Sequence, residues 1–190
     1  DQADLTIPMT CAEAIRRFEP RAVINAAAYT AVDKAENEEN LANTINGDAP
    51  SSMASACAEH DIPLVHLSTD YVFNGLGEVP WSVVDTPDPK NAYGRSKLKG
   101  ENAVRASGCV HTILRTSWVV SAHGNNFVKT MRRLSETRDC IAVVGDQVGG
   151  PTCARDIAQT CISIAEQLIK HPNKSGVYHY SGRPNVSWCQ

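Results

Sequence analysis

Short apolar runs alternate with helix-like segments along the chain, and this alternation constrains the fold more than any other feature. Thr10-x-x-Glu13 resembles a capping box that begins a helix ending at Phe18, and Pro20 breaks the chain before the first apolar run. Strands that alternate with helices predict βαβ units and a parallel sheet. The apolar runs cover residues 22–28, 63–68, 112–116, 141–144 and 176–180, and the helical patterns cover 32–46, 48–60, 92–106, 126–136 and 154–170. We expect the run at 22–28 to be buried on both faces.

Composition excludes several classes of protein. The 190 residues contain no apolar run of about 18, so we expect no membrane span or membrane partner. A net charge of −3 gives no general attraction for nucleic acid. The first four residues are acidic and polar, unlike a signal peptide, so we expect a cytoplasmic protein.

The seven cysteines indicate reduced thiols rather than a disulfide framework, because their number is odd and no Cys-x-x-Cys pair occurs. Cys57 and Cys161 lie in helical patterns, where a thiol behaves as a small buried apolar group. The six histidines show no metal-ligand spacing, and we expect no metal site.

Polar or aromatic residues follow three of the expected strands. Parallel sheets bind ligands beyond the carboxyl ends of their strands, so these positions are candidates for a site. They are Ala28-Tyr29-Thr30, Ser68-Thr69-Asp70 and Thr116-Ser117-Trp118.

Tyr93 and Lys97 lie four residues apart in the helical pattern 92–106, which places both on one face. A nearby cation lowers the pKa of a phenol, so the pair could transfer a proton near neutral pH. Thr69 could bind the oxygen that Tyr93 protonates. Both motifs also have ordinary alternatives: a chance helical pair for the first, and a turn or helix cap for the second.

A strand-end Ser/Thr followed by Tyr-x-x-x-Lys resembles the extended branch of the short-chain dehydrogenase/reductase superfamily. The likeness to one subgroup, the dTDP-4-dehydrorhamnose reductases, extends along nearly the whole chain. The similar segments are 25–36, 67–73, 91–97, 115–119, 124–127 and 146–152.

The resemblance implies a Rossmann-like, doubly wound parallel sheet. Residues 1–145 would form a partial NAD(P)-binding domain, and residues 146–190 would begin a smaller, interleaved substrate-binding region. The implied reaction is reduction of the C4 ketone of dTDP-4-dehydro-L-rhamnose to dTDP-L-rhamnose by NADPH or NADH.

The resemblance also implies roles for individual residues. Tyr93, Lys97 and Thr69 would be catalytic. Thr69, Asp70, Trp118 and Asn126 would bind the sugar, although Trp118 could instead fill the core and Asn126 could cap a helix. The cofactor would contact Tyr93, Lys97, Asp4, Leu5, Ala28, Tyr29 and Thr30, although Asp4 could belong to a frayed terminus.

The Gly-x-x-Gly-x-x-Gly turn with which this family begins is not found in the sequence. We therefore expect an internal fragment of a longer protein, and this fragment could be inactive by itself. The full-length protein could form a homodimer. Tyr71 follows Asp70 where related dehydratases carry Glu, which favours reduction over elimination. Alternatives are another epimerase or reductase of the extended branch, or a non-catalytic subunit like the β subunit of methionine adenosyltransferase.

Overall fold

The computed structural model describes residues 3–189, which divide into two compact units. The first unit extends to Arg115 and includes Cys161–His179; the second contains Thr116–Thr160 and the residues from Tyr180 onward. This division does not follow the expected boundary at residue 145, because the chain leaves the first unit after Arg115 and later returns to it. The cofactor-binding and substrate-binding roles of the two parts remain predictions.

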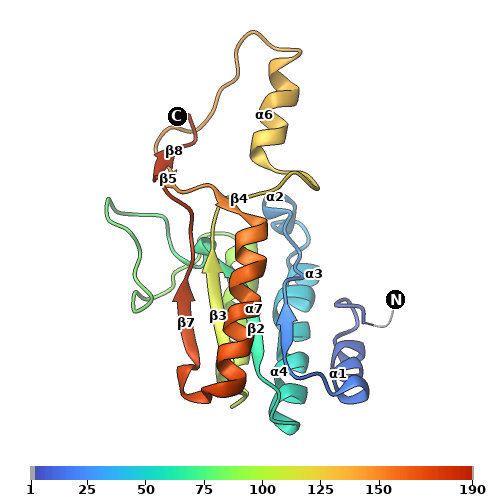
Figure 1. Ribbon diagram of the computed structural model, residues 1–190. Coiled ribbons are helices and arrows are strands. Elements are labelled where there is room, and N and C mark those ends of the chain that lie inside the picture. Colours follow the sequence, from blue (N-terminus) through green and yellow to red (C-terminus); the bar gives the residue numbers. More distant parts are fainter. Residues whose placement is uncertain (1–2, 190) are drawn as a thin grey trace. The chain divides into compact units, whose positions relative to one another are not determined.

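A four-stranded sheet forms the centre of the first unit (Figure 1). β1 pairs in parallel with β2, with Ile24 opposite Val65, and β3 pairs in parallel with β7, with Ile113 opposite Val177. The parallel α/β fold expected from the alternating pattern is therefore confirmed. In spatial order the strands are β1 (Val23–Asn25), β2 (Leu64–Thr69), β3 (His111–Thr116) and β7 (Gly176–His179).

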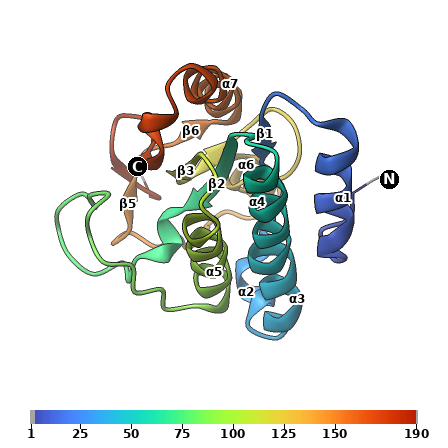
Figure 2. The same ribbon diagram turned by 90° about the horizontal axis from the view of Figure 1, so that it is seen from below.

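Helices cover both faces of this sheet, as in a doubly wound fold. In Figure 2, α4 and α5 lie on one face, and the part of α7 that belongs to the first unit lies on the other. The helices that contribute to this unit are α1 (Pro8–Phe18), α2 (Val32–Ala35), α3 (Glu39–Asn43), α4 (Ala49–Glu59), α5 (Ala92–Ala106) and α7 (Ala154–Lys170).

The core between the sheet and α4 and α5 is built from strand and helix side chains, including Leu64, Ile113, Met53 and Val104. Cys57 belongs to this cluster, and Cys161 is buried on α7, so both thiols act as apolar core groups as expected. All seven cysteines are free. Burial raises the pKa of Cys57 to about 12, which leaves it a neutral thiol at physiological pH.

Three expectations about local structure are wrong. Residues 141–144 form no strand, since an apolar run without a neighbouring strand has no partner for its backbone. The run at 22–28 contributes only β1, at one edge of the sheet, and Ile24 is 40% exposed rather than buried on both faces. α1 begins at Pro8, so Thr10 lies within the helix and its hydroxyl donates to the Ile7 carbonyl at 2.8 Å.

The segment expected as one helix over 32–46 is interrupted. After α2, the chain continues from α3 through a π-helical turn at Thr44–Asp48 directly into α4. The Ala49 N–H donates to the Thr44 carbonyl, five residues back. Pro50 has no N–H to donate to the carbonyl of Asn46, so the wider turn occurs where the regular hydrogen-bond ladder is broken.

The second unit contains α6 (Phe127–Ser135) and two short sheets. β4 (Val119–Val120) pairs in parallel with β6 (Thr152–Cys153), and β5 (Val148–Gly149) pairs antiparallel with β8 (Val186–Ser187). Within residues 3–189, no helix has the length and apolar character needed to cross a membrane.

Candidate functional site

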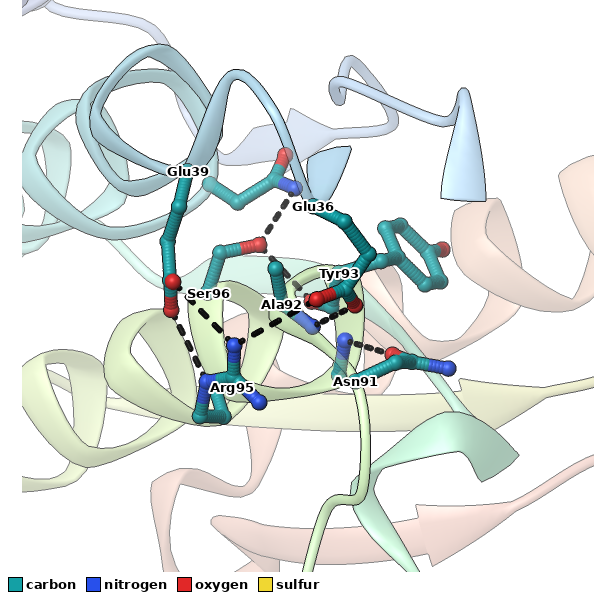
Figure 3. A network of polar contacts seen from close by, with 9 residues as sticks. Glu36, Glu39, Asn91, Ala92, Tyr93, Arg95 and Ser96 are labelled. Carbon is teal, nitrogen blue, oxygen red and sulfur yellow. Dashed lines mark hydrogen bonds and ion pairs between the residues drawn. The ribbon is translucent and has the colours of Figure 1, made fainter. Parts of the chain in front are cut away.

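Tyr93 lies in the first turn of α5, and the start of this helix is fixed from two sides (Figure 3). Asn91 is the N-cap, and its side-chain oxygen accepts the Gly94 N–H at 2.7 Å. Glu36 accepts the Ala92 N–H at 2.7 Å through Oε1. Two of the free N–H groups at the helix N-terminus are therefore satisfied by side chains, which orders the turn that carries Tyr93.

Two further contacts connect this turn to the α3 region. Arg95 forms a bidentate ion pair with Glu39, at 2.8 and 3.1 Å (Figure 3). Ser96 Oγ donates to the Tyr93 carbonyl at 2.7 Å and accepts from Asn46 Nδ2 at 2.9 Å. The Tyr93 carbonyl is thus bound by Ser96, which Asn46 in turn holds in place, and the same helical turn is tied to Glu39 through Arg95.

Two glycines allow α5 to approach its neighbours closely. A Cβ on Gly94 would lie 2.2 Å from the Tyr71 carbonyl oxygen, and one on Gly100 would lie 2.1 Å from the Asn46 carbonyl oxygen. Neither distance is compatible with a larger side chain unless the backbone moves. These contacts bring α5 against the turn that follows β2 and against the π-helical turn.

Thr69 and Tyr93 come together at the carboxyl end of β2, as expected. Burial raises the pKa of Tyr93 to about 12; a side-chain hydrogen bond with Thr69 opposes this effect, and the negative charge of Asp70 adds to it. The ring of Tyr71 packs edge-on against Tyr93, with ring centroids 5.5 Å apart. Tyr93 is therefore a neutral phenol at physiological pH and can donate a proton.

Lys97 is buried one turn further along α5, with 2% exposure. Its Nζ donates to the Leu67 carbonyl at 2.7 Å. Burial lowers the pKa of Lys97 to about 8, and the negative charge of Glu101 opposes this effect. At neutral pH the ammonium is mostly charged but is close to its titration range.

The expected effect of Lys97 on Tyr93 is not found in this structure. The sequence spacing predicts that the ammonium lowers the pKa of the phenol, whereas that pKa is raised. Residues i and i+4 share a helix face, but burial of the Tyr93 ring has the larger effect, and the ammonium donates to the backbone of β2.

Asp70 lies beside these groups and is half-buried. Its Oδ1 accepts from the Thr69 hydroxyl at 3.0 Å, while the Thr69 hydroxyl accepts the Tyr71 N–H at 3.2 Å. Burial raises the pKa of Asp70, and hydrogen bonds from the Thr69 hydroxyl and from the backbone at Asp70 and Tyr71 reduce the effect. Thr69 thus also forms the turn that the alternative interpretation described. Among residues 3–189, no group of three or more His, Cys, Asp or Glu side chains could hold a metal ion.

The segment after β1 is held near α5 by Asn46. The Asn46 side chain accepts the Tyr29 N–H at 2.8 Å and donates to the Tyr29 carbonyl at 3.0 Å. Tyr29 also packs with Tyr93 against a small buried cluster of alanines. Ala28 is half-buried and Thr30 exposed, so the three predicted cofactor contacts share one anchored segment.

The other predicted residues have contacts elsewhere in the chain. Asp4 is exposed and accepts from Thr6, and Leu5 packs against the main core cluster. Trp118 and Asn126 lie in the second unit. Trp118 stacks on Trp188 with ring centroids 3.5 Å apart, and its contact with a sugar remains a prediction.

Asn126 is the N-cap of α6, as the alternative interpretation proposed. Its side-chain oxygen accepts the Lys129 N–H at 3.1 Å, and its Nδ2 donates to the Ser121 carbonyl at 2.7 Å. Its role in binding substrate stays a prediction.

Sequence reasoning missed the residues that support the site. Asn46 carries no motif in the sequence, and the charged pattern around Glu36 and Glu39 is typical of a solvated helix face. For these two glutamates the contacts are long-range. Their partners Ala92 and Arg95 lie 56 residues away, so no local spacing could identify these contacts. The one local signal was the pair of glycines within an otherwise helical pattern, which indicates close approach of another backbone.

Comparison with known proteins gives a consistent result. The family model described as "RmlD substrate binding domain" matches residues 1–190. A dTDP-4-dehydrorhamnose reductase from Sinorhizobium fredii is 46% identical over 188 residues, which are 98% of this chain and 64% of that protein.

Two solved structures of dTDP-4-dehydrorhamnose reductases are also similar. The protein from Clostridium acetobutylicum has a TM-score of 0.88 at 39% identity, over 97% of this chain and 64% of that one. The protein from Bacillus anthracis, solved with NADP, has a TM-score of 0.87 at 38% identity, over 98% and 65%. The chain thus spans less than two thirds of the length of these relatives.

Proposed function

Because the chain belongs to the RmlD substrate binding domain family, we propose that the protein carrying it reduces the C4 ketone of dTDP-4-dehydro-L-rhamnose with a reduced nicotinamide dinucleotide. The observation that supports this most strongly is the placement of Thr69 and Tyr93 at one strand end with Lys97 buried behind them. A neutral phenol and a hydroxyl side by side can both donate hydrogen bonds to one substrate oxygen.

The residues present fit a nicotinamide cofactor. The Lys97 ammonium has three protons and donates one of them to the Leu67 carbonyl. The remaining protons suit the hydroxyl groups of a ribose. Ala28, Tyr29 and Thr30 would line the groove from the anchored segment after β1. A bound reduced nicotinamide supplies the hydride for the reaction.

The chain's own groups would handle the proton and the substrate. The Tyr93 phenol, protonated at neutral pH, donates its proton to the oxygen at C4 as negative charge develops there. The Thr69 hydroxyl, which donates its proton to Asp70 in this structure, would turn to donate it to the same oxygen and polarise the ketone. Asp70, Trp118 and Asn126 would bind the sugar. Tyr71 follows Asp70, so a second carboxylate for elimination of water is not supplied at that position.

The direct test is turnover of dTDP-4-dehydro-L-rhamnose by the purified gene product that carries this sequence, followed as NADPH consumption. Loss of one general acid typically lowers the rate by about 100-fold or more, so we expect that loss for Tyr93→Phe. Tyr178→Phe is the matched control, because the exposed Tyr178 hydroxyl donates to the Lys174 carbonyl on the surface.

Absence of turnover, or equal activity of Tyr93→Phe and wild type, would refute the proposal. Binding of NADPH without turnover would instead support the regulatory-subunit alternative. We further propose that the protein is cytoplasmic. We also propose that its full-length form is a homodimer, and light scattering on that form would measure its molar mass.

A further inference from the structure

A buried ionic network lies directly behind Lys97. Glu101 follows Lys97 by one turn on the same face of α5, and its exposure is 0%. Arg115, at the end of β3, forms a bidentate pair with it at 2.9 and 2.7 Å. Arg105 reaches Glu101 Oε2 at 2.7 Å from the next turn of the helix.

The same carboxylate holds the strand that carries Thr69. Ser68 Oγ donates to Glu101 Oε1 at 2.6 Å, and Ser68 directly precedes Thr69 at the end of β2. Glu101 therefore connects the helix that carries Tyr93 and Lys97 with the strand end that carries Thr69.

The other charged groups of this network are the two arginines that pair with Glu101. Arg115 is buried, and Arg105 is partly exposed. His66, on β2, is fully buried, and its Nδ1 is hydrogen-bonded to Asn25 Nδ2. Burial and the charge of Lys97 lower the pKa of His66 well below its usual value, so its ring is neutral. His179, on β7, also has a lowered pKa, caused by burial and then by Arg115. Glu101 is the anionic group that acts on the Lys97 ammonium.

Stability alone gives a weak reason for such a network. A buried ion pair commonly adds little over apolar side chains of the same size, because both charges must leave water. Glu101 binds the residue that precedes Thr69 and lies one helical turn from Lys97, so it is placed to hold the strand end and to act on the ammonium through its charge. Arg115, stacked over the Phe73 ring at 4.9 Å, keeps Glu101 ionised, and the pKa of Glu101 is lowered despite burial.

We propose that Glu101 is a positioning residue of the reductase site, which holds the Ser68-Thr69 strand end through Ser68 and keeps the buried Lys97 ammonium charged. The inference rests on the proposed function in that Thr69 and Lys97 act in the reduction. The effect of Glu101 on the charge of Lys97 does not depend on the proposed function.

The test compares Glu101→Gln with the double variant Glu101→Gln/Arg115→Met, which does not leave the Arg115 guanidinium buried without a counter-charge. Lysine side chains carrying a ¹³C label are titrated by NMR between about pH 6 and 10, and Lys97→Met assigns the Lys97 signal. Glu59→Gln is the matched control, because Glu59 forms a bidentate pair with Arg16 in an exposed position.

We expect the Lys97 titration midpoint to move to lower pH in both variants and to stay in place in Glu59→Gln. Loss of a neighbouring opposite charge would lower the charged fraction of Lys97 at pH 8 by about fivefold. In the active protein, the alkaline limb of the kcat profile should move in the same direction, with a smaller change in KM.

An unchanged Lys97 midpoint in a folded variant overturns the inference. So does failure of both variants to fold, since Glu101 would then be required for stability and not for positioning. If the wild-type protein shows no reductase turnover, the proposed function fails, and the NMR titration still decides whether Glu101 keeps Lys97 charged.

Discussion

Lys97 carries a cost in stability that the proposed activity explains. Its ammonium is 2% exposed, and its pKa falls from 10.5 to about 8 on folding, chiefly through burial. The difference between the folded and unfolded states corresponds to about 3 kcal/mol of folding free energy lost at neutral pH. A variant without this charge should therefore be more stable than the wild type.

Lys97→Met removes the charge and retains most of the apolar side chain. It also loses the hydrogen bond to the Leu67 carbonyl, at a cost of about 1 kcal/mol. We expect a net gain of about 2 kcal/mol at pH 7, or a rise in Tm of about 4–8 °C for a chain of this size. The same variant should lose reductase activity.

The gain should depend on pH in a defined direction. Between about pH 8 and 10.5 the folded wild type has released the Lys97 proton while the unfolded chain still holds it. Wild-type stability then rises with pH relative to the variant. The advantage of Lys97→Met should therefore shrink as the pH rises from 7, vanish at about pH 10 and reverse above it, because only the cost of the lost hydrogen bond then remains.

Urea unfolding followed by circular dichroism at pH 7 and pH 10 measures this difference between the two proteins. Lys99→Met on the same helix is the control. Lys99 pairs with Asp48 at 2.7 Å but is 47% exposed, so its removal should change stability by less than about 1 kcal/mol. A Lys97→Met variant less stable than wild type at pH 7, or with an advantage that does not depend on pH, would refute the reasoning.

Two glycine substitutions test the close approaches in the fold. Gly100→Ala should lower the free energy of unfolding by about 2 kcal/mol in urea titrations, because its Cβ would meet the Asn46 carbonyl. Asn102 is exposed on the same helix, so the control Asn102→Ala should change this free energy little. Equal effects of the two substitutions would contradict the packing. Gly149→Ala places a Cβ 2.6 Å from Trp118 Cε2 and should change the near-ultraviolet circular dichroism of the Trp118–Trp188 stack. Gly145→Ala, with ordinary contact at 3.6 Å, should not; an unaltered spectrum in both would show that the stack does not rest on Gly149.

Periodicity and turn chemistry predicted the elements that carry the site. α5 occupies residues 92–106, as expected from its apolar spacing, and β2 ends at Thr69 after a short apolar run. These features are local, so a single sequence contains them. The run at 141–144 had the same local character and no partner strand, which shows that an apolar run by itself does not determine sheet pairing.

The electrostatic state of the site was not predictable from spacing. Four residues between Tyr93 and Lys97 indicate a shared helix face, but the pKa of each group depends on burial and on contacts with Leu67 and Asp70 from another element. Likewise, Glu36 caps α5 across 56 residues of sequence, a pairing that only the folded chain defines.

The π-helical turn at Thr44–Asp48 makes chain length itself a constraint on the site. Each residue of an α-helix turns the chain by about 100°, so deletion of one residue here would rotate Asn46 away from Tyr29 and Ser96 or displace all of α4. A substitution preserves the number of residues in the turn, so the chain can keep this geometry. Related sequences should therefore show substitutions in this turn but no insertions or deletions. The same rule can guide the choice of segments that are exchanged in engineered hybrid proteins.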